Sequence, residues 1–429
     1  MTEMVSPGPV ATTRAALAFI YATVLFDALA FGIIIPVLPL LVQDFVGEPA
    51  RAAEMYGLFG TVWAVMQFLC SPLLGVLSDR FGRRPVLIIS AIGLGLDYVV
   101  MAWAPTLAWL FLGRVLSGVT SAGFATASAY IADTTPPEKR AGAFGMVGAA
   151  WGVGFILGPV LGGLLGGVSA RAPFWGAAVL SLVSAGYALF VLPESLRPEH
   201  RMLFSWRRAN PVGSLGLLRS RPGLFGLAAV NFLNFLAFQV LPAVYVLYAN
   251  YRFGWEAAQV GVALGLVGAS NIVVQGVLVR RVIARIGERS ALLVGLFFGS
   301  ASFVLYGLAP NDIVFLAAIL LWAPIGFVGP ALQGFMTRRV SPSEQGQLQG
   351  ANSSILGLTG VIGPGLFTII FAFFIGTQVA FQLPGAPFLL AALLMAGALM
   401  LASRVTRMRE GGSLSLGMAQ DRFNPDSGT

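Results

Sequence analysis

Long apolar stretches follow one another along most of the chain and are separated by short polar segments. Each is about 20 to 28 residues long, and a helix needs about 20 residues to cross the hydrocarbon layer of a membrane. Strands of a membrane barrel would instead alternate polar and apolar residues over about 10 positions. The pattern predicts membrane-spanning helices at about residues 15–42, 56–77, 86–104, 107–131, 141–168, 172–192, 223–248, 257–279, 290–309, 313–336, 346–374 and 383–403.

Twelve such segments predict an all-α polytopic membrane protein with 12 transmembrane helices in two six-helix bundles. Residues 193–222 form the longest polar stretch between helices and contain four prolines and six arginines. This stretch separates six helices from six. We therefore expect a cytoplasmic N-terminus at 1–14, an N-terminal bundle at 15–192, a central cytoplasmic loop at 193–222, a C-terminal bundle at 223–403 and a cytoplasmic tail at 404–429.

The composition supports a membrane protein and argues against an enzyme. Of the 429 residues, 57% are hydrophobic and 10% are charged, whereas soluble domains carry about 25% charged residues. The single histidine, His200, lies in the central loop, and the single cysteine, Cys70, lies in an apolar run. With no catalytic constellation and no cluster of metal ligands, we expect neither enzymatic activity nor a metal or cofactor.

Basic residues are unevenly divided between the two sides of the membrane when the loops between the twelve helices are assigned to alternate sides. The side that holds both termini carries 22 of the 26 lysines and arginines, and the opposite side carries three. The positive-inside rule therefore predicts that both termini are cytoplasmic. This topology explains the net charge of +8, so the charge does not indicate nucleic-acid binding. We expect the lipid bilayer, and no nucleic acid, as a partner.

The two halves resemble each other at a spacing of 205 residues. Residues 80–84 read RFGRR and residues 285–289 read RIGER, and Gly158-Pro159 corresponds to Gly363-Pro364. Parallel helical repeats are typical of two-bundle transporters, whose substrate cavity lies between the bundles near the middle of the membrane. In the second half, Ala284 stands where the first has Asp79, and Glu288 stands where it has Arg83. We therefore expect any corresponding latch in the second half to be degraded.

Three charged residues lie well inside predicted helices: Asp27, Asp97 and Arg114. Charges in hydrocarbon are costly and indicate functional sites. At 1.5 Å per residue, Asp97 and Arg114 both lie roughly 10 Å below the outer boundary, so an ion pair is possible, either for coupling or only for folding. Asp27 lies roughly 22 Å deep with no basic residue at its level. Burial without a partner favours a protonated carboxyl group, so we assign proton coupling to these three residues.

Uncharged polar residues inside helices are candidates for substrate binding. They can hydrogen-bond a substrate or simply link helices. Gln239 and Asn271 are the stronger candidates because they lie in the middle of the seventh and eighth helices. The weaker candidates are Asn231 and Gln333.

The loop after the second helix and the fifth helix carry distinctive motifs. Residues 75–85 read GVLSDRFGRRP, and residues 145–163 read GMVGAAWGVGFILGPVLGG. They resemble the loop signature of the major facilitator superfamily and the fifth-helix signature of its drug/proton antiporters. DALAFGIIIPVLP at 27–39, GRVLSG at 113–118 and RFGW at 252–255 resemble the tetracycline/proton antiporter branch.

The loop motif is interpreted as a conformational latch, with the alternative that it only determines topology. Gly82 permits a tight reversal, and a helix N-terminus stabilises a carboxylate, so Asp79 can latch onto the start of the eleventh helix. The resemblance implies that Arg83 pairs with Asp133. The latch set is Asp79, Arg80, Gly82, Arg83, Arg84 and Asp133.

The fifth-helix motif places glycines four residues apart, which allows another helix to approach closely, and its proline can bend the helix. The resemblance adds that dry packing here prevents leakage between the bundles. The motif residues are Gly145, Gly154, Gly158, Pro159, Gly162 and Gly163.

The sequence departs from the tetracycline branch at two positions. In the ninth helix that branch has an acid, and this chain has Gly299. In the eighth helix the branch has a histidine, and this chain has Asn271. We therefore expect weak recognition of tetracycline.

Together these patterns predict a proton-coupled exporter of small amphipathic compounds in the inner membrane, with a small-molecule substrate and protons as its partners and acting as a monomer. The alternatives are a proton symporter or facilitator for an endogenous metabolite or lipid, a non-transporting sensor or scaffold, and a membrane-embedded enzyme.

Overall fold

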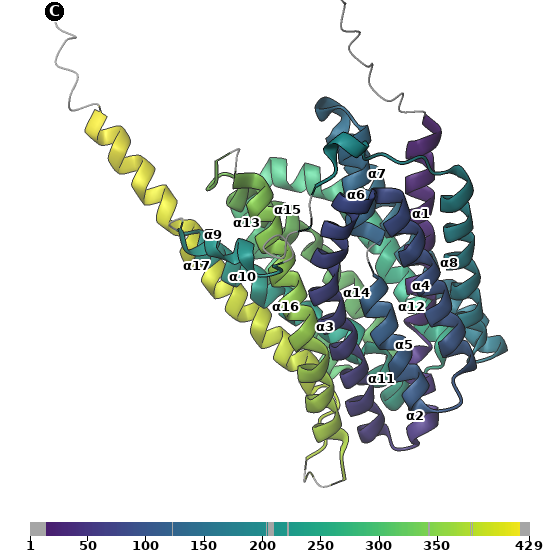
Figure 1. Ribbon diagram of the computed structural model, residues 1–429. Helices are drawn as coiled ribbons and strands as arrows, with labels where there is room; N and C mark the ends of the chain where they lie inside the picture. The colour runs from purple at the N-terminus through teal and green to yellow at the C-terminus, as the bar shows by residue number, and fades with distance from the viewer. Residues whose placement is uncertain are drawn as a thin grey trace, which may run out of the picture. The chain divides into compact units, whose positions relative to one another are not determined.

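The computed structural model describes residues 14–420 except 122, 203, 205–209, 221–222, 342–343, 378 and 380. The expected N-terminal segment before residue 14, part of the central loop and the last residues of the tail lie outside the described residues. The described residues form helices and no strands (Figure 1). This confirms the predicted all-α membrane fold.

Eleven helical segments are long and apolar enough to cross a membrane. One of them, Ala257–Leu308, is 52 residues long and contains a non-helical residue, Gly287, with φ 77°. It therefore provides two crossings, the eighth and ninth, which agrees with the predicted twelve.

The first eight helices account for six crossings. They are α1 (Arg14–Ile34), α2 (Leu38–Val46), α3 (Pro49–Phe81), α4 (Arg83–Trp103), α5 (Leu107–Thr120), α6 (Gly123–Thr134), α7 (Pro137–Val168) and α8 (Ala172–Val191). The remaining helices are α9 (Gly216–Ser220), α10 (Leu224–Phe238), α11 (Val240–Phe253), α12 (Ala257–Val273), α13 (Val279–Leu308), α14 (Asp312–Trp322), α15 (Val328–Thr337), α16 (Gln345–Ile375) and α17 (Ala386–Gln420).

Several crossings are interrupted at points that the apolar pattern does not mark. The first crossing breaks between α1 and α2 around Pro36, because proline lacks the N–H that a helix requires. The seventh breaks at Gln239, the eighth contains a π-helical turn at Val274–Leu278, and the tenth contains a 3-10 turn at Ala323–Phe327. Single π-helical turns within α-helices are frequent at functional sites.

The chain forms two compact units. The first comprises Met1–Val212, Gln239–Ile272 and Gly357–Pro387, and the second comprises Gly213–Phe238, Val273–Leu356 and Phe388–Thr429. The first unit thus contains the expected first bundle together with parts of the seventh, eighth and eleventh crossings. The division into two six-helix bundles at the central loop stays a prediction.

Within the first unit, α7 lies directly against α1. An added Cβ at Gly154 would lie 2.5 Å from the Cβ of Ala28, and one at Gly158 would lie 2.7 Å from the Cα of Gly32. A Cβ at Gly162 would overlap the carbonyl oxygen of Ile33. The glycine row of the fifth-helix motif therefore brings two backbones into contact, as small residues do in membrane helices.

The same helix packs against α12 with its adjacent face. A Cβ at Gly163 would lie 2.6 Å from the carbonyl oxygen of Ala257, and one at Gly261 would lie 2.5 Å from that of Pro159. The fifth crossing is thus held between the first and the eighth. Gly145, by contrast, has no neighbour within 4 Å of its would-be Cβ.

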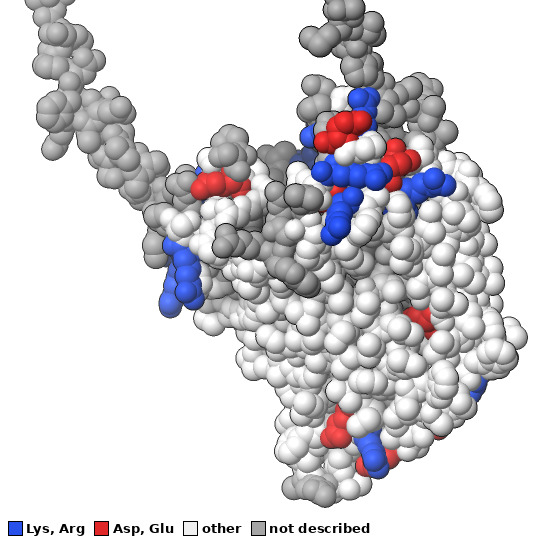
Figure 2. All heavy atoms as spheres, in the orientation of Figure 1, with Lys and Arg blue, Asp and Glu red and all other residues white. Residues whose placement is uncertain are grey.

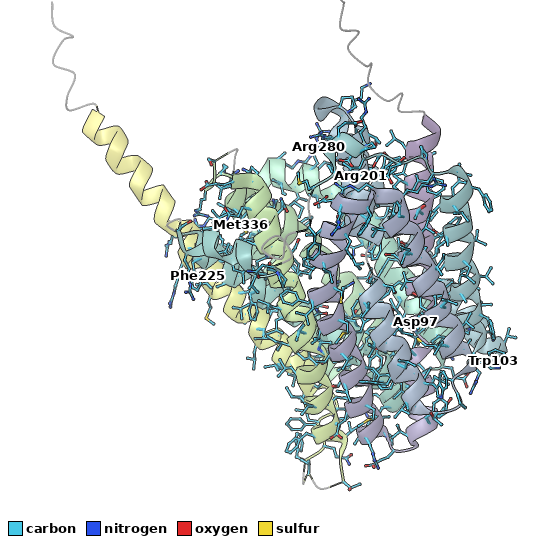
Figure 3. The ribbon with its side chains drawn as sticks, viewed as in Figure 1. Asp97, Trp103, Arg201, Phe225, Arg280 and Met336 are labelled. Atoms are coloured by element: carbon cyan, nitrogen blue, oxygen red, sulfur yellow. The ribbon has the colours of Figure 1, made fainter. Side chains whose placement is uncertain are left out.

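Few charged side chains lie at the visible surface of the middle of the first unit. Lysine and arginine gather at one end of it, where α4 and α7 begin, and the band beyond that end is almost free of charge (Figure 2). At the opposite end of α4, Trp103 lies at the surface with 73% of its area exposed (Figure 3). An exposed tryptophan at a helix end fits the aromatic belt of a membrane interface.

The glycine packing leads to a stability prediction. Gly162→Ala should lower the free energy of unfolding by about 1–3 kcal/mol, because overpacking at a backbone contact forces the helices apart. Gly145→Ala is the matched control and should not destabilise, because its Cβ meets open space and alanine favours a helix. Thermal unfolding of the purified variants measures both. Equal stabilities would contradict the α1–α7 contact.

Candidate functional site

An acid and a base face each other inside the first unit. Asp97 of α4 is fully buried, and its carboxylate lies 3.7 Å from the guanidinium of Arg114 on α5. The backbones approach closely because position 113 is glycine, where a Cβ would lie 2.7 Å from Asp97 Oδ1. The ion pair that the depth estimate allowed is therefore present, and Figure 3 shows Asp97 on α4 within this unit.

The pair is electrostatic and lacks a direct hydrogen bond. Neither carboxylate oxygen of Asp97 accepts a hydrogen bond from Arg114 in the described structure, and Arg114 Nε has no hydrogen-bond partner there; the side chain of Ser117 lies beside the carboxylate. Arg114 Nη2 instead donates to the sulfur of Met101 at 3.2 Å. A carboxylate held at this distance keeps its oxygen atoms available for a proton, as reversible protonation requires.

Asp27 lies on α1 without a cation beside it in the described structure. Its Oδ1 is buried and has no hydrogen-bond partner among the described residues. Its other oxygen lies against Gly123, the first residue of α6, where a Cβ would overlap Oδ2. Asp27 thus meets the point at which the fourth crossing is interrupted, a feature that the sequence did not predict.

The loop motif forms a network of charges at the arginine-rich end. Arg83 pairs with Asp79 at 2.5 Å and with Asp133, at the end of α6, at 3.0 Å. Arg83 also donates to the hydroxyl of Ser78 at 2.7 Å. The pairing of Arg83 with Asp133, which the family resemblance implied, is present.

Sequence reasoning missed one member of this network, Glu194. Its carboxylate accepts hydrogen bonds from the backbone N–H of Arg83 at 2.8 Å and of Arg84 at 3.2 Å. These are the first residues of α4, whose free N–H groups favour an anion. Gly82 makes the contact possible because it has φ 108° and because a Cβ there would overlap Glu194. Only the fold brings residue 194 to this turn, so no local sequence signal marked it.

The other two members of the expected latch extend the network outwards. Arg84 donates to the carbonyl oxygen of Leu189 on α8 at 2.5 Å. The guanidinium of Arg80 lies 5.1 Å from the ring centre of Phe81.

The candidate substrate residues fall into two groups. In the second unit, the amide of Asn231 donates to Asn352 at 3.1 Å, and Asn352 donates to Gln333 at 3.2 Å. These two candidates therefore link helices through Asn352. In the first unit, Gln239 lies at the break of the seventh crossing and packs against Gly363, whereas Asn271 is exposed on α12.

At one end of the first unit, α3 and α7 contact parts of later crossings. Tyr56 of α3 donates to the carbonyl oxygen of Pro242 on α11 at 3.0 Å. A Cβ at Gly60 of α3 would lie 2.9 Å from Pro364 of α16. With the contact of α7 and α12, these contacts join the first unit's early crossings to parts of the seventh, eighth and eleventh. None of them was predicted, because they join residues far apart in the sequence.

The search for a metal site gives a simple result. Within the part of the chain that the structure describes, no group of three or more His, Cys, Asp or Glu side chains could hold a metal ion.

Comparisons with known proteins agree with this fold. The family model described as Major Facilitator Superfamily matches residues 20–364 and, in a second match, 232–414. The chain therefore belongs to the major facilitator superfamily, whose members are membrane transporters.

Individual relatives refine this assignment. The chain is 40% identical over 357 residues to the class C tetracycline resistance protein of Escherichia coli, covering 83% of this chain and 90% of that protein. It is 36% identical over 350 residues to the class B protein of the same organism, covering 81% and 86%. The predicted resemblance to this branch is confirmed.

Solved structures show the same fold. The human organic anion transporter MFSD10 (TETRAN) superposes with a TM-score of 0.68 at 25% identity and covers 91% of this chain and 99% of its own. A bacterial homolog of the human lysosomal transporter Spinster gives a TM-score of 0.72 at 15% identity, covering 91% and 96%. The eleven spans and the bacterial relatives identify a multi-pass protein of the inner membrane.

The buried pair of Asp97 and Arg114 predicts different losses of stability for removal of the acid and removal of the base. Asp97→Asn should cost about 3–5 kcal/mol of stability, because it leaves Arg114 buried without its counter-charge, and arginine cannot be deprotonated in proteins. Arg114→Gln should cost less, because a carboxyl group can neutralise itself by binding a proton. The double variant should recover most of the loss.

Thermal unfolding of the three purified variants makes this comparison. Equal losses for the two single variants, or no recovery in the double variant, would contradict the electrostatic coupling of the pair.

Proposed function

We propose that this protein is a proton-coupled secondary active exporter of small amphipathic compounds that works by alternating access. The observation that carries the proposal is the pair of membrane-buried carboxyl groups, Asp27 with an oxygen that has no hydrogen-bond partner in the described structure and Asp97 held 3.7 Å from Arg114. A buried carboxylate is stable when it is neutralised by a proton or by a nearby cation. Export then follows if a substrate competes with the proton.

The direction of coupling follows from the proposed topology, with both termini cytoplasmic. A proton from outside neutralises Asp27 or Asp97 and favours the inward-facing state. Substrate from the cytoplasm then displaces the proton, which is released inside. Proton entry down its gradient thereby drives substrate outwards, and Arg114 holds Asp97 in place between the two steps.

The contacts that join α3 and α7 to later crossings support alternating access, because we propose that they close one end of the first unit. Under the proposed topology it is the external end, where α7 meets α12 and Tyr56 meets Pro242. Breaking these backbone contacts would open the path to the outside. Because they involve glycine and carbonyl groups rather than charges, they can separate without exposing an unpaired ion to lipid.

The loop network supplies the latch of the opposite end. Asp79 shares Arg83 with Asp133, so Asp79 can leave this pair while Arg83 keeps a counter-charge. In the proposed cycle, Asp79 exchanges Arg83 for the N-terminus of the eleventh helix when the outside is open. Arg80, Gly82 and Arg84 hold the turn at the membrane surface.

The substrate is proposed to be uncharged or weakly charged and amphipathic. Gln239 and Asn271 are its proposed polar contacts, because Gln239 lies at the break of the seventh crossing and Asn271 is exposed on α12. Relatives that are tetracycline resistance proteins support export of a drug-like compound over uptake of a metabolite.

Replacement of Asp27 tests the proposed coupling. Asp27→Asn resembles the protonated carboxyl group in size but cannot release a proton. In proteoliposomes with an imposed pH gradient, uphill transport of an amphipathic fluorescent compound should fall to the level of protein-free vesicles, while binding of the compound persists. Asp44→Asn is the matched control, since Asp44 is an exposed carboxylate of α2, and it should leave transport unchanged.

Full pH-driven accumulation by Asp27→Asn would contradict the role of this residue and leave Asp97 as the proton carrier. Loss of binding together with coupling would show instead that Asp27 contacts the substrate directly.

A second prediction separates this chain from its relatives. Position 299 lacks the acid of the ninth helix, and a Cβ there would lie 2.7 Å from Cδ1 of Ile325, the end of a side chain that can shift. Expression in a susceptible host should therefore give weak or absent tetracycline resistance, measured as growth inhibition. The double variant Gly299→Asp, Asn271→His restores both ionisable residues and should raise resistance. Strong resistance of the parent chain, abolished by an uncoupler, would contradict this prediction.

A further inference from the structure

The turn between the eighth and ninth crossings carries an ion pair of its own. Glu288 follows the break at Gly287, and Arg338 lies at the end of α15. Arg338 Nη1 donates to Glu288 Oε1 at 2.8 Å, and Nη2 donates to Oε2. Two parallel hydrogen bonds between a guanidinium and a carboxylate form a strong and directional pair. Both residues belong to the second unit.

This pair stands at the repeat positions of a pair in the first unit. At the spacing of 205 residues, Glu288 corresponds to Arg83, and Arg338 corresponds to Asp133. Arg83 and Asp133 are themselves paired at 3.0 Å. The positions are thus the same in both halves, and the charges are reversed.

The backbone of the two turns corresponds as well. Gly82 and Gly287 are 205 residues apart, and they have φ 108°, ψ 160° and φ 77°, ψ 162° respectively. Each turn therefore reverses direction at a glycine with positive φ and places the next residue against the end of a following crossing. The expected loss of a second latch concerns position 284, which has no acid to exchange partners, and it stays a prediction; the pair of Glu288 and Arg338 was not predicted.

The neighbour four residues earlier explains why the charges can reverse. In the first turn, Asp79 lies 2.5 Å from Arg83, so an acid at position 83 would be repelled. In the second turn the corresponding residue is Ala284, which is exposed and carries no charge. Position 288 is therefore free to be an acid. Glu288 also lies amid the arginines 285 and 289, which favour a negative charge at this position.

A glycine on α15 leaves room for the carboxylate of Glu288. A Cβ at Gly334 would lie 2.9 Å from Glu288 Oε1 and 3.0 Å from Oε2. Glu288 therefore rests against the helix backbone, one turn before Arg338. The guanidinium of Arg338 in turn lies 5.3 Å from the ring centre of Phe335.

We propose that Glu288 and Arg338 are a charge-reversed counterpart of Arg83 and Asp133, and that they position the turn between the eighth and ninth helices against the end of the tenth. The two turns differ in one respect. Arg83 has two acidic partners and can lose one of them, whereas Glu288 has no third charge at position 284. The second pair is therefore a fixed clamp, and exchange of partners is confined to the first turn.

The absence of a charge at position 284 provides the sharpest test. An acid placed there lies next to position 288, as Asp79 lies next to Arg83. Ala284→Asp should therefore be unfavourable beside Glu288 and favourable beside an arginine. The variant Glu288→Arg with Arg338→Asp supplies that arginine and rebuilds the charges of the first half.

The experiment measures the half-life of purified protein at a fixed unfolding temperature. Glu288→Gln and Arg338→Gln should each shorten the half-life roughly threefold, the size of effect expected of a partly exposed pair. Glu288→Arg alone should shorten it further, and adding Arg338→Asp should restore it to within about twofold of the parent. Ala284→Asp should shorten the half-life of the parent and lengthen that of the double variant, and high salt should reduce both effects.

An effect of Ala284→Asp with the same sign in both backgrounds would overturn the proposal. A double variant no more stable than Glu288→Arg alone would overturn it too. If Glu288→Arg does not fold, the double-mutant cycle of Glu288→Gln and Arg338→Gln decides instead. Additive losses of half-life would overturn the proposal, and non-additive losses would support the pair. No transported compound is needed, so the result is independent of the proposed function.

Discussion

A charge inside the hydrocarbon layer is stable only when a proton or a counter-charge neutralises it, and the chemistry of this protein depends on that constraint. Asp97 is neutralised by Arg114, which the glycine at position 113 allows to approach. Asp27 lies against the interrupted fourth crossing, and no cation faces it in the described structure. One acid is therefore held by a fixed partner and the other requires a mobile one. This difference is what suits two carboxyl groups to a cycle in which protons and substrate exchange.

The glycine rows provide the mechanical counterpart of this electrostatic arrangement. α7 contacts α1 and α12 through glycine backbones and apolar side chains, so the first unit holds parts of late crossings without burying further charge. The interruptions at Gln239 and at the π-helical turn Val274–Leu278 fall next to the points where the chain passes from one unit to the other. A crossing that is broken in its middle can belong to two units without straining a continuous helix.

The sequence predicted the elements well and their interruptions poorly. Hydropathy marks where a helix must cross a membrane, and each of the twelve expected segments contains helix. Hydropathy does not record a break inside an apolar run, although Pro36 and Pro324 were local signals that went unused. The helix ends extend beyond the apolar stretches as well, as in α3, because a helix continues past the hydrocarbon boundary.

The same reasoning explains which parts of the site were found. Asp27, Asp97 and Arg114 are visible in the sequence because a charge interrupts an apolar run, and Arg83 with Asp133 because the motifs are distinctive. Glu194 and Tyr56 could not be identified, since each acquires its role from a partner more than 15 residues away. Glu288 shows the limit most clearly: sequence reasoning predicted only the loss of a second latch, and the position of Arg338 revealed an ion pair with opposite charges.

The central claim, that substrate and proton compete for a buried carboxyl group, is tested most directly by measuring proton release. An amphipathic compound that binds the purified protein is added in weakly buffered solution, and a pH indicator follows the protons released at several starting pH values. The account predicts that binding releases protons in the pH range where the buried acids are protonated, and that the release diminishes in Asp27→Asn. Binding of the compound without proton release at any pH would contradict the account.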